Sequence, residues 1–308
     1  MKYQVRKSIV IDADPNTVRP YVADLRQWAA WSPWSIIEPD HKSSFAGTHG
    51  EVGSSMSWDG DVIGSGKMTL VSVVNEEYEH KLEFFAPWKS QAKATVALQA
   101  KGASTQVTWT MDGTMPFYLF FMVGMMKAWI GMDYDRGLRM LKELAENGQI
   151  DAQTSDLGVV DFEGFAYVGL ANTSLVQDMP SDMQADFDRL MRDIAAASCD
   201  PKHHLAIYTN VKMSKQRFSY ISAVSDESAS GLALSDDYVR GRIPSQKMLE
   251  IRHRGSYRFL GNAWSMGHMV ARAKKMKTNG KPFEYYHNSP NEVAENELLT
   301  SVYFPVKG

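Results

Sequence analysis

The alternation of apolar and polar side chains predicts that the chain opens with a β-strand, at residues 3–11. Asp14-Pro15 follows and is typical of a helix start, with the aspartate as cap and the proline in the first helical position. Strand-like runs between glycine-rich turns then predict an antiparallel meander. These runs are SMSWDG, KMTLVSVV, HKLEFF, KATVALQA and TQVTWTMDG.

A long amphipathic helix closes this first half of the chain. Leu138, Leu141 and Leu144 recur at near-helical spacing, and Gly148 supplies the left-handed residue that a helix C-terminus favours. A curved sheet wrapped on one long helix encloses a space. The order of elements therefore predicts an α+β domain with a cavity.

The polar stretch QIDAQTSDLG, which has no periodicity, follows that helix. We interpret it as an interdomain linker because it carries neither a strand nor a helix pattern. The expected division is a first domain at residues 1–147, a linker at 148–156 and a second domain at 157–308.

The second half shows an order of strand, helix, strand and strand, and this order occurs twice. The first copy begins with GFAYVGLANTSLV and ends with the strands LAIYTNVKM and RFSYISAVS. The second begins with MLEIRHRGSYRFLG and ends with PFEYYHN and LLTSVYFPV. Such internal repetition predicts a pseudo-twofold domain of two β-α-β-β units that share one groove.

Composition and charge narrow the function. The 308 residues are 44% hydrophobic and 22% charged, which is typical of a globular protein with a real core. A net charge of −3 gives no basic field, and no helix-turn-helix precedes the second domain, so we expect no nucleic-acid partner. The longest uncharged run, between Asp112 and Lys127, is too short to span a membrane, and no apolar signal stretch opens the chain. We therefore expect a cytoplasmic location.

The first half of the chain contains, in this order, the runs VADLRQWAAWSPW, GEVGSSMSW, VTW and GMDYDRGLRMLK. On these runs, residues 1–147 resemble the polyketide-cyclase-type branch of the START-like (SRPBCC) superfamily. The resemblance implies a helix-grip fold, in which an antiparallel sheet surrounds a long C-terminal helix, with a deep apolar cavity. Its members range from lipid and hormone binders to cyclases, so the fold alone does not fix the function.

The second half of the chain contains the runs RGSYRFLGNAW, PFEYYHNSP and ELLTSVYFPV. On these runs, residues 157–308 are similar to the GyrI-like effector-binding domain, the ligand module of many bacterial multidrug-sensing activators. The resemblance implies a ligand in the central groove. It places Tyr257, Trp264, Tyr285 and Tyr303 around that groove. The family usually carries a glutamate where this chain has Ser301, so we expect neutral ligands unless Glu284 or Glu297 substitutes.

Aromatic residues are the main candidates for ligand contact, although each also fits a packed core. Trp31 belongs to a tryptophan set at three-residue spacing, and core packing is its more favoured role. Trp129, with Phe121, Met125 and Met126, is either a soft gate over the cavity or core. The candidate ligand-binding residues are Trp31, Trp58, Trp109, Trp129, Tyr167, Tyr257, Trp264, Tyr285, Ser301 and Tyr303.

The sequence contains no recognisable metal, cofactor or nucleophile motif. The eight histidines have no ligand spacing, and Cys199, the single cysteine, has no activating partner nearby in sequence. One candidate acid–base set lies in the second groove, with Glu284 and Tyr257 as its catalytic candidates beside Tyr285 and Tyr303. A solvent-facing Glu284 is nevertheless the favoured interpretation.

Two main functional hypotheses follow. The first is a non-enzymatic protein that binds, sequesters or senses neutral apolar or aromatic small molecules, with a cavity in each domain. The alternative is an enzyme, either cyclase-like or a hydrolase of hydrophobic xenobiotics, that uses Glu284 and Tyr257. An adaptor regulated by a partner protein also stays open, as does the oligomeric state.

Overall fold

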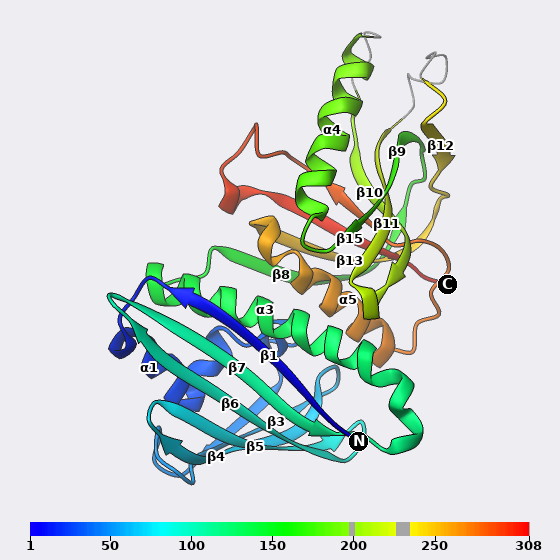
Figure 1. Cartoon of the computed structure of the whole chain (residues 1–308). Coiled ribbons are helices and arrows are strands. Elements are labelled where there is room, and N and C mark those ends of the chain that lie inside the picture. The colour runs from blue at the N-terminus through cyan, green and yellow to red at the C-terminus, as the bar shows by residue number, and fades with distance from the viewer. Residues whose placement is uncertain (197–200, 226–234, 308) are drawn as a thin grey trace. The chain divides into compact units, whose positions relative to one another are not determined.

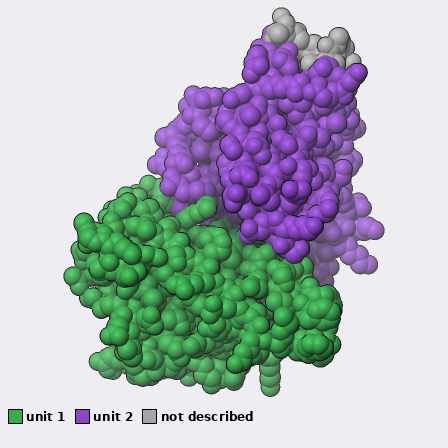
Figure 2. Space-filling view, viewed as in Figure 1, with its two compact units in different colours: residues 1–151 green, residues 152–308 purple. Residues whose placement is uncertain are grey.

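The computed structural model describes residues 1–196, 201–225 and 235–307, with the backbone alone at residue 196. Cys199 lies outside the described residues. The chain divides into two compact units, Met1–Asp151 and Ala152–Gly308 (Figure 2). The linker is shorter than the sequence indicated, because a strand begins at Ala152 and pairs along its length with a later strand.

Unit 1 is an antiparallel meander that ends in one long helix, as predicted. Its sheet has seven strands in the order β1-β7-β6-β5-β4-β3-β2. The N-terminal strand pairs with the last one, so the sheet brings the start of the chain next to the segment before the long helix (Figure 1). The strands are β1 (Lys2–Ile11), β2 (Lys42–Ala46), β3 (Ser55–Gly60), β4 (Gly64–Val74), β5 (Glu77–Ala86), β6 (Ser90–Lys101) and β7 (Ser104–Thr114).

The long helix α3 (Val123–Asn147) packs against this sheet and completes the α+β helix-grip arrangement. It buries Tyr134, Leu138 and Leu141, and it ends where Gly148 adopts a positive φ of 77°. The remaining helical segments of unit 1 are short. They are α1 (Pro15–Ala23), η1 (Leu25–Ala30), α2 (Pro33–Ile37) and η2 (Phe117–Met122).

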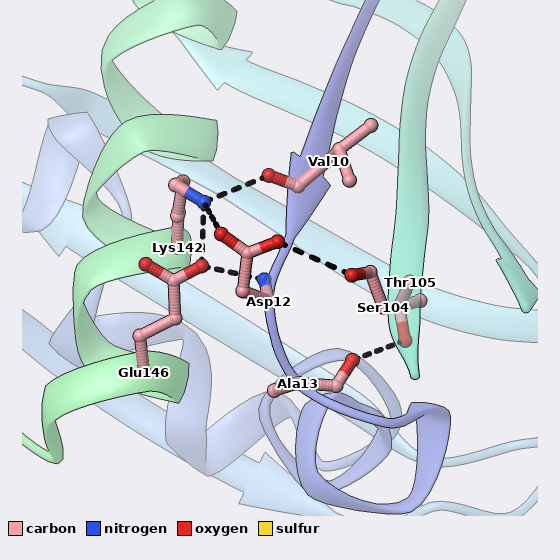
Figure 3. Close-up of polar contacts among 7 residues, drawn as sticks. All are labelled: Val10, Asp12, Ala13, Ser104, Thr105, Lys142 and Glu146. Carbon is pink, nitrogen blue, oxygen red and sulfur yellow. Dashed lines mark hydrogen bonds and ion pairs between the residues drawn. The ribbon is translucent and has the colours of Figure 1, made fainter. Parts of the chain in front are cut away.

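The last turns of α3 are tied to the end of β1 (Figure 3). The Lys142 ammonium donates to the Val10 carbonyl at 3.0 Å, to the Asp12 carboxylate at 3.2 Å and to Glu146 at 2.5 Å. Glu146 also accepts from the Asp12 backbone N–H at 2.5 Å. One lysine thus joins the helix to the turn that leads into α1.

Unit 2 has the repeated β-α-β-β order that the sequence predicts. The two copies are β9–α4–β10–β11 and β13–α5–β14–β15, and their second strands, β10 and β14, pair at the centre of an eight-stranded antiparallel sheet. The strand order is β12-β9-β11-β10-β14-β15-β13-β8. The strands are β8 (Ala152–Phe162), β9 (Ala166–Leu175), β10 (His204–Lys212), β11 (Arg217–Ser225), β12 (Tyr238–Arg242), β13 (Gln246–Gly255), β14 (Phe283–Tyr286) and β15 (Leu299–Pro305).

Helices α4 (Met179–Ala196) and α5 (Gly261–Ala273) pack on the same face of this sheet, which we call the helix face. The short segments η3 (Met213–Lys215), η4 (Tyr257–Phe259) and η5 (Glu295–Glu297) connect the main elements. The opposite face carries a separate apolar cluster that includes Phe165, Ile207 and Phe283. Because side chains alternate along a strand, neighbouring residues of β14 and β15 belong to different faces.

Candidate functional site

The structure divides the predicted site residues of unit 2 between the two faces of its sheet. Tyr257 and Trp264 lie on the helix face, with Glu284. Tyr167, Tyr285, Ser301 and Tyr303 lie on the opposite face. The expected single groove lined by all of these residues is therefore wrong. Strand alternation on β14 explains the split, because Glu284 and Tyr285 must point in opposite directions.

Glu284 is buried on the helix face, so the solvent-facing interpretation of this residue is also wrong. It is 4% exposed and sits on β14, between Ala206 of β10 and Val302 of β15. Its carboxylate accepts hydrogen bonds from the Tyr208 hydroxyl at 3.0 Å, the Trp264 indole N–H at 2.6 Å and the Tyr286 hydroxyl at 2.6 Å.

Burial and hydrogen bonding shift the pKa of the Glu284 carboxyl in opposite directions. Burial raises the pKa of its carboxyl, and the hydrogen bonds from Tyr286, Trp264 and Tyr208 offset only part of that rise. All three donors are neutral groups, so among the described residues no cationic side chain bonds to the carboxylate. The site can take up either a proton or a positive charge.

Aromatic rings surround this carboxylate. Tyr208 and Trp264 meet edge to face with centroids 4.6 Å apart, and Tyr257 meets Tyr286 at 5.6 Å. Tyr257 is 37% exposed, so the group reaches the surface there. We call Glu284 and these four rings the Glu284 cluster. Ring faces beside a buried carboxylate suit a planar organic cation, which gains from both.

Ser301 is fully buried, and it lies beside another carboxylate. Its hydroxyl donates to Glu250 of β13 at 2.7 Å and lies 2.8 Å from the ring nitrogen of His287. The Arg252 guanidinium donates to the same Glu250 oxygen at 2.6 Å. The opposite face thus holds a buried negative charge next to Ser301, but an arginine compensates it.

The remaining candidates on this face pack against neighbouring strands. Tyr303 is 8% exposed and lies among Phe162 and Phe283, and burial raises its pKa to about 12. Tyr285 shares a hydrogen bond with His203. Tyr167 lies against β12, where only a glycine at position 241 leaves room for its ring.

Sequence reasoning missed Tyr208, Tyr286, Glu250 and Arg252 as site residues. Glu250 stands in a strand pattern, MLEIRHRG, whose charged positions read as solvent-facing until the pairing of β13 with β15 is known. Tyr208 lies in the other copy of the repeat from Glu284, and only the central pairing of β10 with β14 brings them together.

In unit 1 the structure brings together two of the four predicted tryptophans. Trp31 and Trp109 are fully buried with centroids 5.1 Å apart, and Trp109 stacks on Tyr134 at 3.8 Å. This is the packed-core alternative for Trp31. Trp58 instead meets Phe84 on the strands at 5.9 Å, while Trp129 is 49% exposed.

The proposed gate residue Phe121 is also exposed, so it covers no interior. Near the tryptophans, His80 is completely buried. Neither of its ring nitrogens has a hydrogen-bond partner of normal geometry, and the Trp109 indole N–H has none within the described residues. Burial lowers the pKa of His80 to about 4, and the backbone of Tyr78 and Ala94 offsets only part of this effect.

Over the part of the chain that the structure describes, no group of three or more His, Cys, Asp or Glu side chains could hold a metal ion. In the same residues, no helix is both long and apolar enough to cross a membrane.

Comparison with known families agrees with the two-unit fold. Residues 2–146 match the family described as polyketide cyclase / dehydrase and lipid transport. Residues 165–307 match the family described as GyrI-like small molecule binding domain. Among curated proteins, none matches the chain significantly.

Several solved structures are similar at low identity. EcmrR in its complex with DNA is 13% identical over 62% of this chain and 68% of its own, with a TM-score of 0.43. Protein CV1439 from Chromobacterium violaceum is 16% identical over 46% of this chain and 97% of its own, at 0.36. Aha1 from Colwellia psychrerythraea is 16% identical over 48% and 99%, also at 0.36.

Both family matches fall on separate units and follow the order that the sequence motifs indicate. The chain therefore joins a START-like domain of the polyketide cyclase type to a GyrI-like small-molecule binding domain.

Proposed function

We propose that this protein binds small organic molecules without converting them, and that the Glu284 cluster is one binding site. The observation that carries the proposal is a carboxylate only 4% exposed, held by three neutral donors inside a set of aromatic rings. A charge placed this way keeps most of its attraction for a cation, because little solvent screens it and no side-chain cation among the described residues bonds to it.

The proposed ligand class is a planar organic cation. The expectation of neutral ligands rested on Ser301, and it allowed for substitution by Glu284. The buried position of Glu284 supplies that substitution on the helix face. Because burial raises the pKa of this carboxyl, a bound cation favours its ionised form and drives release of a proton. Cation affinity should therefore rise with pH.

The test compares ethidium, a planar cation, with phenanthridine, the corresponding neutral ring system. Titration of the full chain should give tighter binding of ethidium, and E284Q should weaken it by roughly tenfold or more, with little effect on phenanthridine. E163Q, at an exposed position of the same unit, is the matched control. Equal ethidium affinity in wild type and E284Q would contradict the proposal.

Unit 1 is proposed as a second module, for a lipophilic guest. One support is the family match of unit 1. The other is that the ring nitrogens of His80 and Trp109 have no hydrogen-bond partner of normal geometry among the described residues, so a polar atom of a bound ligand could satisfy them. The test is native mass spectrometry of the protein as purified, with W109F as the comparison. A guest retained equally by both proteins would argue against a role for the Trp109 nitrogen.

Catalysis stays the second candidate, because a buried carboxyl with a raised pKa is suited to proton transfer. Against it, Tyr257 does not hydrogen-bond to Glu284 in the described structure, and burial raises the Tyr257 pKa to about 12. Incubation of ethidium and of lipophilic esters with wild type, E284Q and Y257F would decide. Product formed by wild type and lost in variants that still bind would favour an enzyme.

A further inference from the structure

One end of the unit 1 sheet carries an exposed aromatic surface that the proposed function does not use. The segment η2 has no buried residue, and its rings project into solvent. Phe117 is 79% exposed and Phe121 is 69% exposed, with Tyr118 and Phe120 similarly open. Trp129 follows two turns into α3 and is also exposed. Soluble proteins rarely leave so many large apolar side chains together without a binding role.

A second loop adds to the same end of the sheet. Lys2 pairs with Thr114 and Ala92 pairs with Gly113, so the β5–β6 turn, the N-terminus and the start of η2 lie at the same end of the sheet (Figure 1). Phe85, at the end of β5, and Trp88, in the turn, are both exposed. We call these exposed residues together the aromatic end surface. It comprises Phe85, Trp88, Phe117, Tyr118, Phe120, Phe121 and Trp129.

The charges around this surface are positive. The N-terminal ammonium donates to the Met115 carbonyl at 2.6 Å, and Lys2, Lys89 and Lys127 are exposed nearby in the sequence. The sequence has no Asp or Glu from 84 to 111 or from 113 to 132.

Two of the three bordering acids are paired with cations of the protein itself. Asp135 pairs with Lys7 at 2.5 Å, and Asp133 pairs with Arg136. The third, Asp112, accepts a hydrogen bond from the neutral side-chain amide of Gln4 at 2.8 Å. The three lysines and the N-terminal ammonium outnumber Asp112, so the aromatic end surface keeps an excess of cations.

We propose that the aromatic end surface binds the surface of a lipid bilayer that contains anionic headgroups. Phe, Trp and Tyr side chains are favoured at the boundary between headgroups and acyl chains, where their rings are buried and the polar atoms of Trp and Tyr stay hydrated. Lysines at the edge are attracted by anionic lipid. A second copy of the chain is a poorer partner, because a symmetric contact would bring the same cations together.

The test is co-flotation of the full chain with vesicles, either of phosphatidylcholine alone or of phosphatidylcholine and phosphatidylglycerol in equal amounts. We expect binding to the mixed vesicles that weakens as salt rises. F120S/F121S should reduce the partition coefficient by at least roughly tenfold, because two rings no longer insert. K127E should reduce it by roughly fivefold or more and flatten the salt dependence.

Two matched controls lie at the opposite end of the same sheet. V74S removes an exposed apolar side chain beside the β4–β5 turn, and K101E reverses an exposed charge beside the β6–β7 turn. Both should float as wild type does. Absence of flotation with the mixed vesicles at low salt would overturn the proposal, as would equal losses in the controls. Light scattering that detects a dimer abolished by F120S/F121S, with vesicle binding unchanged, would assign the surface to self-association instead.

Discussion

Burial shifts the pKa values of two titratable residues of this protein, Glu284 and His80, in opposite directions. It raises the pKa of the Glu284 carboxyl and lowers that of the His80 imidazole to about 4, because a poorly solvated site favours the neutral form of either group. The pH dependence of stability therefore has opposite signs at the two residues.

His80 should make unit 1 sensitive to acid. The pKa of His80 in the folded state lies below its value in the unfolded state. Its contribution to the free energy of unfolding is therefore complete above about pH 6.5 and is lost as pH falls towards 4. The gap corresponds to about 3 kcal/mol of unfolding free energy. Urea unfolding followed by tryptophan fluorescence at several pH values measures the loss, and H80L should remove most of it. The same acid slope in H80L would place the loss on other groups.

Ser301 should matter for stability through Glu250. Its fully buried hydroxyl donates to that carboxylate at 2.7 Å, so S301A should cost about 1–3 kcal/mol by leaving an acceptor less satisfied. S301E should cost more, because it sets a second buried carboxylate against the first. Equilibrium unfolding of both variants tests this order. The control is S219A on β11, which removes a solvent-exposed hydrogen bond between the hydroxyls of Thr173 and Ser219. Equal stability of S301E and wild type would contradict the hydrogen bond between Ser301 and Glu250.

At the scale of elements, the short bridge between α3 and β1 is built on one half-buried lysine, Lys142. Burial lowers the pKa of Lys142, but the hydrogen bonds to Glu146 and Asp12 outweigh it, so the pKa lies above its usual value. The bridge spans 130 residues of sequence from Asp12. It fixes the end of the helix onto β1, an edge strand of the sheet (Figure 3).

K142M should lower the stability of unit 1 by less than about 1 kcal/mol, since the pair is solvated and screened. The loss should shrink as salt rises, which urea unfolding at low and high ionic strength would measure. K101M, at an exposed lysine on the same sheet, should show neither effect. A loss that does not change with salt would assign the effect of Lys142 to packing of its aliphatic stem.

Elements with strong local patterns were predictable from the sequence. The meander, the closing helix with its glycine cap and the repeated β-α-β-β order all appear in the structure. The sequence predicts which side chains of a strand share a face of the sheet, but not which of the two faces that is. Alternation separates Glu284 from Tyr285, but the sequence does not say which face the helices cover. Trp264 was consequently grouped with Tyr285, although it bonds to Glu284.

At the scale of the whole molecule, the sequence predicted two domains and their families, because each carries its own motifs in order. It offered Glu284 as a possible carboxylate for the site, but favoured a solvent-facing position for that residue. Glu284 and Tyr208 are 76 residues apart and meet only through the central pairing of the sheet, while Glu250 meets Ser301 across 51 residues. Long-range register, not local composition, decides the charge inside unit 2.

Because each unit has its own sheet and its own buried core, we expect the full chain to unfold in two transitions. H80L should change the acid sensitivity of the unit 1 transition only. S301A should lower the midpoint temperature of the unit 2 transition only. Fragments 1–151 and 152–308, expressed separately, should each reproduce one transition in calorimetry. A single transition that both substitutions shift would mean that the units stabilise each other, and the effects of Glu284 and His80 would then have to be measured in the intact chain as one coupled system.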